Sequence, residues 1–167
     1  FNYTAAYTYL SVMGTLQPDV PQTHGSDRPI TITAPDGSLV NPRDRAPVAS
    51  RSVLSERILT SVNGALHQAL PGEIAAGGSE QFWEAMKFTG SDGTDQQVLS
   101  EGYYGGAGAH SDRDGFPAVS SGPNVRNMPV EVIESVYPLR MNKYRLEPDT
   151  AGAGRYQGGS GTVREYE

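Results

Sequence analysis

Hydrophobic residues repeat with a helical period in one long segment, residues 50–70. Five of them recur four positions apart, which places them on one face of an α-helix. They are Leu54, Ile58, Val62, Leu66 and Leu70. Pro71 and Gly72 follow directly and end the pattern. The sequence therefore predicts a long amphipathic helix over residues 50–70.

Two shorter helices and a hairpin are also predicted. Residues 4–16 carry apolar residues at helical spacing, and residues 129–136 begin with a proline, which suits the first turn of a helix. The segment 30–33 is rich in β-branched residues and runs into the turn 34–37, which contains Pro and Gly. Leu39 and Val40 then resume an apolar pattern, which favours a hairpin.

From residue 77 onward the apolar period becomes that of strands and turns. The predicted strands cover residues 81–89, 97–104, 139–146 and 162–167. Helical and alternating patterns thus segregate along the chain, which favours an α+β fold, strand-rich toward the C-terminus and packed on the helix at 50–70. No linker is long enough to divide the chain, so we expect one segment over residues 1–167.

Composition and charge exclude several classes of partner. The formal net charge is −6 and the 13 basic residues are scattered, so the chain lacks the basic face that nucleic acids need. There is no cysteine, hence no disulfide and no thiolate-bound metal. No apolar run reaches membrane-spanning length and no signal-peptide pattern is present. We expect no nucleic-acid or membrane partner and a cytoplasmic location.

A glycine-rich run follows the aromatic pair Tyr103-Tyr104 and contains Gly105, Gly106 and Gly108. Glycines allow a backbone to approach a ligand closely and expose N–H groups to anions. They equally allow a tight turn or a crowded strand crossing. The run is neither a Walker loop nor a dinucleotide fingerprint.

His110, Asp112 and Asp114 have a spacing that is compatible with metal binding. The glycine-rich surroundings favour turn residues instead. No nucleophile elbow or catalytic triad is present, so no catalytic residue is assigned.

Arg126 lies in the stretch Ser120–Asn127. A guanidinium suits a carboxylate or a phosphate. Pairing with Glu131 or Glu134 is the alternative.

Several motifs in one order resemble the C-terminal part of the hydantoinase B/oxoprolinase family. They begin with R-P-I at Arg28, A-P-D-G-S-L at Ala34 with N-P at Asn41, and A-L-H-Q-A-L-P at Ala65. They continue with G-G-A-G-A-H-S-D-R-D-G, N-V-R-N-M-P-V-E-V-I-E and Y-P-L-R-M-N-K-Y-R-L-E-P-D-T-A-G-A-G-R-Y-Q-G-G-S-G-T-V-R-E-Y-E. Many family members carry a T-H-M-T-N-T type string in the 120–127 loop, from which this chain departs.

The resemblance implies part of the B-type subunit of an ATP-dependent cyclic-amide hydrolase of the hydantoinase or 5-oxoprolinase kind. It implies an A-type partner that binds ATP, and a divalent metal on N-terminal residues with no counterpart here, so this segment alone is expected to bind neither. A ketone carboxylase of the acetone or acetophenone type, or a purely structural segment of such a complex, are the alternatives. Family members are much longer, so we expect a C-terminal piece that does not fold or act alone.

Two sets of residues follow from these expectations. The residues expected to contact a small-molecule substrate are Tyr103, Gly105, Gly106, Gly108, His110, Asn124 and Arg126. The apolar residues expected to face the remainder of the same protein or the A-type partner are Leu54, Ile58, Val62, Trp83 and Phe88.

Overall fold

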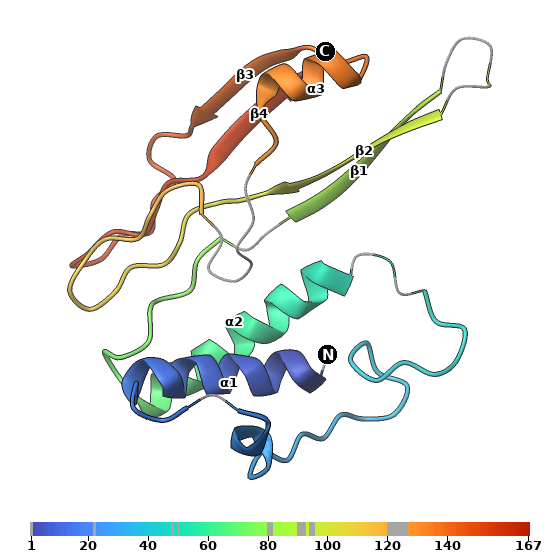
Figure 1. The fold of residues 1–167 in the computed structure, drawn as a ribbon. Coiled ribbons are helices and arrows are strands. Elements are labelled where there is room, and N and C mark those ends of the chain that lie inside the picture. The colour runs from blue at the N-terminus through green and yellow to red at the C-terminus, as the bar shows by residue number, and fades with distance from the viewer. Residues whose placement is uncertain are drawn as a thin grey trace. The chain divides into compact units, whose positions relative to one another are not determined.

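The computed structural model describes residues 2–21, 23–47, 49, 51–79, 82–89, 93, 96–119 and 127–167 (Figure 1). The chain divides into two compact units, Phe1–Gly77 and Gly78–Glu167. The single segment expected over residues 1–167 stays a prediction. Mixed helices and antiparallel strands confirm the α+β class.

The first unit is helical. It contains α1 (Asn2–Leu16), the 3-10 helix η1 (His24–Asp27) and α2 (Arg51–Ala69), and α1 packs on α2. Both long helices lie where the periodicity places them. Helix α2 is 19 residues long.

The structure does not support the long amphipathic helix expected here. The five residues of its predicted apolar stripe are only half-buried, whereas Glu56 is buried. The partner helix α1 contributes Ala6 and Thr8 to the buried set, and its Thr4 hydroxyl lies 3.5 Å from that of Ser55.

The hairpin predicted near residues 30–40 does not form. Residues 30–35 are extended without strand pairing, and one isolated bridge joins Ser38 to Asn41. Gly37, at φ +74°, donates its N–H to the Asn41 carbonyl at 2.9 Å. Pro35 and Pro42 flank this turn and have no N–H to donate, so a ladder cannot extend past it.

The second unit contains two antiparallel hairpins and a short helix. Strands β1 (Phe82–Thr89) and β2 (Gln96–Tyr103) form one hairpin, and β3 (Met141–Leu146) and β4 (Thr162–Tyr166) form the other. Helix α3 (Val130–Val136) precedes β3. These bounds confirm the predicted strands and helix to within about two residues.

The apolar core of this unit is small. Leu99 and Ile133 are fully buried, and Tyr104 is 5% exposed. Leu99 pairs with Met86 across the first hairpin, and the Phe88 ring lies 6.2 Å from that of Tyr137. The five residues expected at an interface are all half-buried, and that interface stays a prediction.

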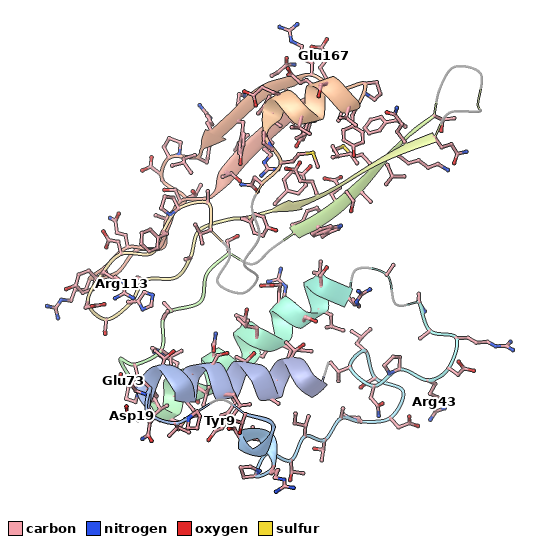
Figure 2. All side chains as sticks on the ribbon, viewed as in Figure 1. Tyr9, Asp19, Arg43, Glu73, Arg113 and Glu167 are labelled. Atoms are coloured by element: carbon pink, nitrogen blue, oxygen red, sulfur yellow. The ribbon has the colours of Figure 1, made fainter. Side chains whose placement is uncertain are left out.

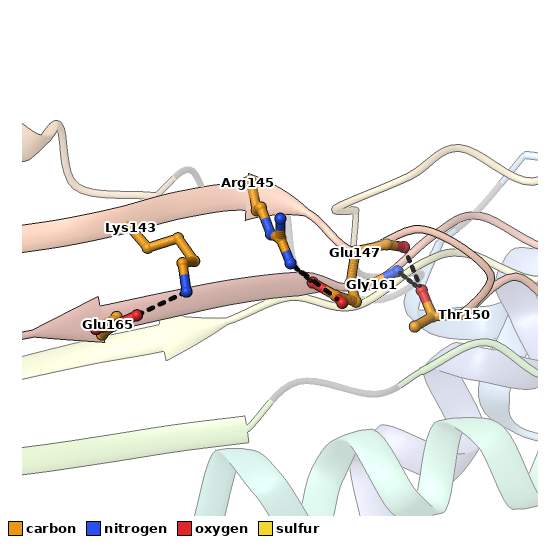
Figure 3. Close-up of polar contacts among 6 residues, drawn as sticks. All are labelled: Lys143, Arg145, Glu147, Thr150, Gly161 and Glu165. Carbon is orange, nitrogen blue, oxygen red and sulfur yellow. Dashed lines mark hydrogen bonds and ion pairs between the residues drawn. The ribbon is translucent and has the colours of Figure 1, made fainter.

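Exposed ion pairs and hydrogen bonds lie along the second hairpin and in the loop that connects β3 to β4 (Figure 3). Lys143 pairs with Glu165 at 2.8 Å across the strands. The Thr150 hydroxyl donates to the Glu147 carbonyl at 2.8 Å and accepts the Gly161 N–H at 2.9 Å. Exposed ion pairs contribute little, so the hydrogen bonds of the Thr150 hydroxyl to the backbone do more to hold the connection.

Four backbone segments meet in what we call the glycine crossing: residues 78–79, 105–108, 115–117 and 157–160. Gly106 accepts the Ser79 N–H at 2.8 Å, and Ala107 accepts the Gly159 N–H at 2.8 Å. A Cβ placed on Gly106 would collide with the backbone of Gly159. The glycines are therefore required by close backbone packing.

We expect Gly106→Ala to destabilise the full-length protein by about 1–3 kcal/mol, because the added methyl group meets backbone that cannot move aside. Gly152→Ala is the matched control, since a Cβ at Gly152 has open space around it. Denaturant unfolding of both variants measures the difference. Equal stability of the two variants would contradict the crossing as described.

Candidate functional site

The predicted glycine run forms the centre of the glycine crossing. The Cβ position of Gly105 would collide with Ser79, and Gly106 and Gly108 are buried. Their surroundings are filled by other backbone segments, which supports the strand-crossing interpretation that the sequence left open. Contact of these glycines with a substrate stays a prediction.

The three residues with metal-like spacing make turn contacts. The His110 N–H donates to the Arg113 carbonyl at 2.9 Å, and Asp112 pairs with Arg113 at 3.2 Å on the exposed loop (Figure 2). Asp114 accepts the Gln157 N–H at 2.7 Å, which ties its turn to the glycine crossing. Across the described part of the chain no three His, Asp or Glu side chains lie close enough to hold a metal ion, and the metal that the resemblance implies stays an expectation for the whole complex.

Asn124 and Arg126 lie outside the described residues. Their contact with substrate, and the alternative pairing of Arg126 with Glu131 or Glu134, stay predictions. The Glu134 carboxylate accepts the Met141 N–H at 2.8 Å, which joins α3 to the start of β3.

Tyr103 belongs to a buried charged cluster. We call this set, Glu101, Tyr103, Tyr144, Arg164 and Tyr166, the Arg164 cluster. The side chains of Arg164 and Glu101 are 2% and 4% exposed, and Arg164 Nη1 lies 2.6 Å from Glu101 Oε1. Charged side chains are seldom buried so completely without a partner.

Two tyrosine rings enclose the guanidinium. Its central carbon lies 4.7 Å from the ring centroid of Tyr103 and 4.5 Å from that of Tyr144. Arg164 Nη2 also donates to the Tyr144 hydroxyl at 3.2 Å. A cation over an aromatic face is attracted by the ring quadrupole, and more strongly when water is excluded.

The Glu101 carboxylate accepts two further hydrogen bonds. The Tyr166 hydroxyl donates to it at 3.1 Å and the Met128 N–H at 3.3 Å. Several donors together satisfy a carboxylate better than the cation alone. The cluster thus joins β2, β3, β4 and the segment before α3.

Burial affects the acid–base behaviour of the cluster. It raises the pKa of Tyr103, with smaller contributions from Tyr166 and from the Glu84 and Glu101 carboxylates. Burial also raises the pKa of the Tyr166 phenol. Burial lowers the pKa of Arg164, but hydrogen bonding to Tyr166 and the charge of Glu101 outweigh it and raise the value overall. Both phenols therefore remain neutral donors beside a permanent cation.

Sequence reasoning found Tyr103 but missed its partners Glu101, Tyr144, Arg164 and Tyr166. One signal was available. Glu101 with Tyr103, and Arg164 with Tyr166, stand two positions apart in predicted strands, and such residues share one face of a sheet. Each pair combines a tyrosine with a charged residue, and the two charges, Glu101 and Arg164, are opposite. This pattern indicates that the two strand faces pack against each other and bury the charges together.

No helix in the described part of the chain is long and apolar enough to cross a membrane.

The family model for hydantoinase B/oxoprolinase matches residues 1–167, the full length given. The chain belongs to the hydantoinase B/oxoprolinase family. The expected resemblance is confirmed.

Three curated relatives illustrate the family. The B subunit of a putative D-/L-hydantoinase from Pseudomonas sp. (strain NS671) is 35% identical over 90% of this chain and 25% of its own length. The beta subunit of the caprolactamase from Pseudomonas jessenii is 32% identical over 95% of this chain and 29% of its own length. The 5-oxoprolinase of Dictyostelium discoideum is 29% identical over 98% of this chain and 12% of its own length. The chain thus spans a quarter or so of the length of the first two relatives, and less of the 5-oxoprolinase.

We expect Arg164→Met to destabilise the full-length protein by about 3–5 kcal/mol, because it leaves the Glu101 charge buried and unpaired. Arg155→Met is the matched control, since Arg155 also lies over a tyrosine ring, that of Tyr156 at 5.5 Å, but is exposed. The control should change stability by less than about 0.5 kcal/mol. Urea unfolding of both variants measures this, and similar losses would contradict the buried pair.

The raised pKa values of Tyr103 and Tyr166 predict a loss of stability in alkali. Below their ordinary pKa of 10.0 both phenols are protonated in the folded and unfolded states. Above it the unfolded chain ionises first, so the free energy of unfolding falls as pH rises. Unfolding between about pH 9 and about pH 11 should show a shallower fall for Tyr103→Phe than for the wild type. An unchanged slope would contradict the predicted shift.

Proposed function

We propose that this chain is part of the B-type subunit of an ATP-dependent cyclic-amide hydrolase of the hydantoinase or 5-oxoprolinase kind. The observation that carries the proposal is the family match over residues 1–167. It is supported by relatives whose names refer to hydantoinase, caprolactamase and 5-oxoprolinase activity. Hydantoin, caprolactam and 5-oxoproline are all cyclic amides.

The reaction that we propose for the whole complex is activation followed by hydrolysis. ATP transfers its γ-phosphoryl group to the amide oxygen on an A-type subunit and leaves as ADP. Water then adds to the activated carbon, and the tetrahedral intermediate breaks at its C–N bond, so that the nitrogen takes up a proton and leaves as an amine while the carbon remains as an acyl phosphate. A second water attacks the acyl phosphate, giving a carboxylate and inorganic phosphate. Phosphorylation supplies a leaving group that an unactivated amide lacks.

The proposed partners are the remainder of the same protein and an A-type subunit. Two of the relatives are named as a B and a beta subunit of their enzymes, which supports a multi-subunit assembly. Within it we assign substrate contact to the segment Tyr103–Asp114 together with Asn124 and Arg126. An aromatic wall, backbone N–H groups and a fixed cation suit a polar cyclic ligand. The location we propose is the cytoplasm.

Incubation of the purified full-length complex with ATP and a panel of cyclic amides tests the proposal. The panel should include hydantoin, 5-oxoproline and caprolactam, with ADP and ring-opened product measured together. We expect one ring opening that depends on ATP, and none when ATP is omitted. ATP-dependent fixation of bicarbonate onto acetone or acetophenone, with no ring opening, would overturn the proposal in favour of a ketone carboxylase.

A further inference from the structure

One hairpin of the second unit leaves a long strand edge open. The sheet of β1 and β2 has two strands (Figure 1), so β1 pairs along one side only. In an antiparallel ladder every second residue turns its N–H and C=O away from the partner strand. In the described part of the chain no backbone hydrogen bond outside the hairpin involves residues 82–89. The outer edge of β1 thus presents a row of backbone donors and acceptors.

The sequence of β1 does not protect this edge. Natural proteins protect strand edges by keeping them short, or with proline, a bulge or charged side chains. β1 has eight residues, more than the usual length of about five or six, and contains no proline. Its register with β2 runs without a shift over the whole strand, and Lys87 is its one basic residue. A regular strand of this kind is a template for a further strand.

The second hairpin has the protection that β1 lacks. Its register shifts between Met141 and Lys143, an irregularity that interrupts the ladder. Lys143 and Arg145 stand two positions apart in β3, and each forms an exposed ion pair, with Glu165 and Glu147 respectively. Charged side chains along an edge disfavour a further strand. The two hairpins of the unit therefore differ: β3 resists a further strand and β1 accepts one.

One face of the first hairpin is also uncovered. Side chains alternate along a strand, so Trp83, Ala85 and Lys87 of β1 share a face. Val98 and Ser100 of β2 lie on it too, because they pair with Lys87 and Ala85. Of these five residues only Trp83 is half-buried, and the others are exposed. The Trp83 indole N–H donates to the Ser100 hydroxyl at 2.7 Å, so covering the ring would leave its donor paired.

We propose that the outer edge of β1 docks a β-strand from the remainder of the same protein, which extends the hairpin to at least a third strand. The backbone groups of an open edge specify an extended segment as the occupant. This chain covers 25% and 29% of the length of two subunit relatives, so most of each of those proteins lies outside the matched part. The inference rests on the proposed function, in which this chain is part of a longer B-type subunit.

The stability of the hairpin favours an occupant from the same polypeptide. Two-stranded hairpins are marginally stable in water, and a third strand or other packing is needed for independent stability. Leu99 is the one apolar side chain of β1 and β2 that is buried. A strand on which folding depends is supplied most reliably by the same polypeptide, since a tethered segment has a high effective concentration. A second copy of the chain and the A-type subunit are the competing occupants.

Residue-resolved hydrogen exchange of the full-length protein tests the edge. An open edge protects alternate amides, because those that face away from β2 exchange with water. We expect instead that consecutive amides over residues 83–88 all exchange about a hundredfold or more slower than unpaired amides. The internal control is β3, whose amides over residues 142–146 should alternate between slow and fast. Alternating exchange along β1 would overturn the proposal.

Photo-cross-linking in the assembled complex identifies the occupant. A benzoylphenylalanine introduced in place of Ala85 in the full-length protein is irradiated in a mixture of isotope-labelled and unlabelled copies. We expect a cross-link to a peptide of the same copy that lies outside residues 1–167. The matched control is the same probe in place of Asn142, an exposed residue of β3, which should give no such cross-link. A cross-link from position 85 to a second copy or to the A-type subunit would overturn the assigned occupant, and so would the lack of any cross-link outside residues 1–167.

Both readouts are independent of turnover, so the docking edge and the proposed function can fail separately. A full-length protein that protects all β1 amides but opens no cyclic amide would contradict the proposed function and support the docking edge. An active complex with alternating exchange along β1 would do the reverse.

Discussion

The second unit depends on one buried ion pair, that of Arg164 and Glu101. Burying either charge alone would cost several kcal/mol, and the two remain together because their attraction is supported by three tyrosines and a backbone N–H. The pair joins strands from both hairpins, β2 and β4, which are far apart in sequence. The ion pair therefore links the two hairpins to each other, which the turn within either hairpin cannot do.

Two-stranded hairpins have little stability alone, and the apolar core available to them here is small. The Arg164 cluster connects the hairpins through side chains, and the glycine crossing connects the intervening loops through backbone alone. The Asp114 carboxylate, bound to the Gln157 N–H, adds a side-chain tie to that crossing. Directed polar contacts thus fix an arrangement that apolar burial by itself would leave loosely specified.

Periodicity predicted the helices and the four strands because these depend on neighbours along the chain. It failed at residues 30–40, where β-branched residues favour a strand but Pro35 and Pro42 prevent a ladder. It placed α2 correctly, but the five residues of the expected apolar stripe are only half-buried, while Glu56 on the same helix is buried. The Arg164 cluster was missed because Arg164 and Tyr103 lie 61 positions apart, on strands of two different hairpins, and meet through side-chain packing between those hairpins. For the glycine run at residues 105–108 the sequence left two interpretations open, approach to a ligand and a crowded backbone crossing. The structure supports the crossing, because the backbone of Gly159 fills the space beside Gly106.

A double-mutant cycle between Glu101 and Arg164 tests this account most directly, with the free energy of unfolding of the full-length protein as the readout. Glu101→Leu and Arg164→Met should each be strongly destabilising, and the double variant should lose far less than the sum, giving a coupling of about 2 kcal/mol or more. Additive losses, with a coupling near zero, would contradict the claim that this pair organises the unit.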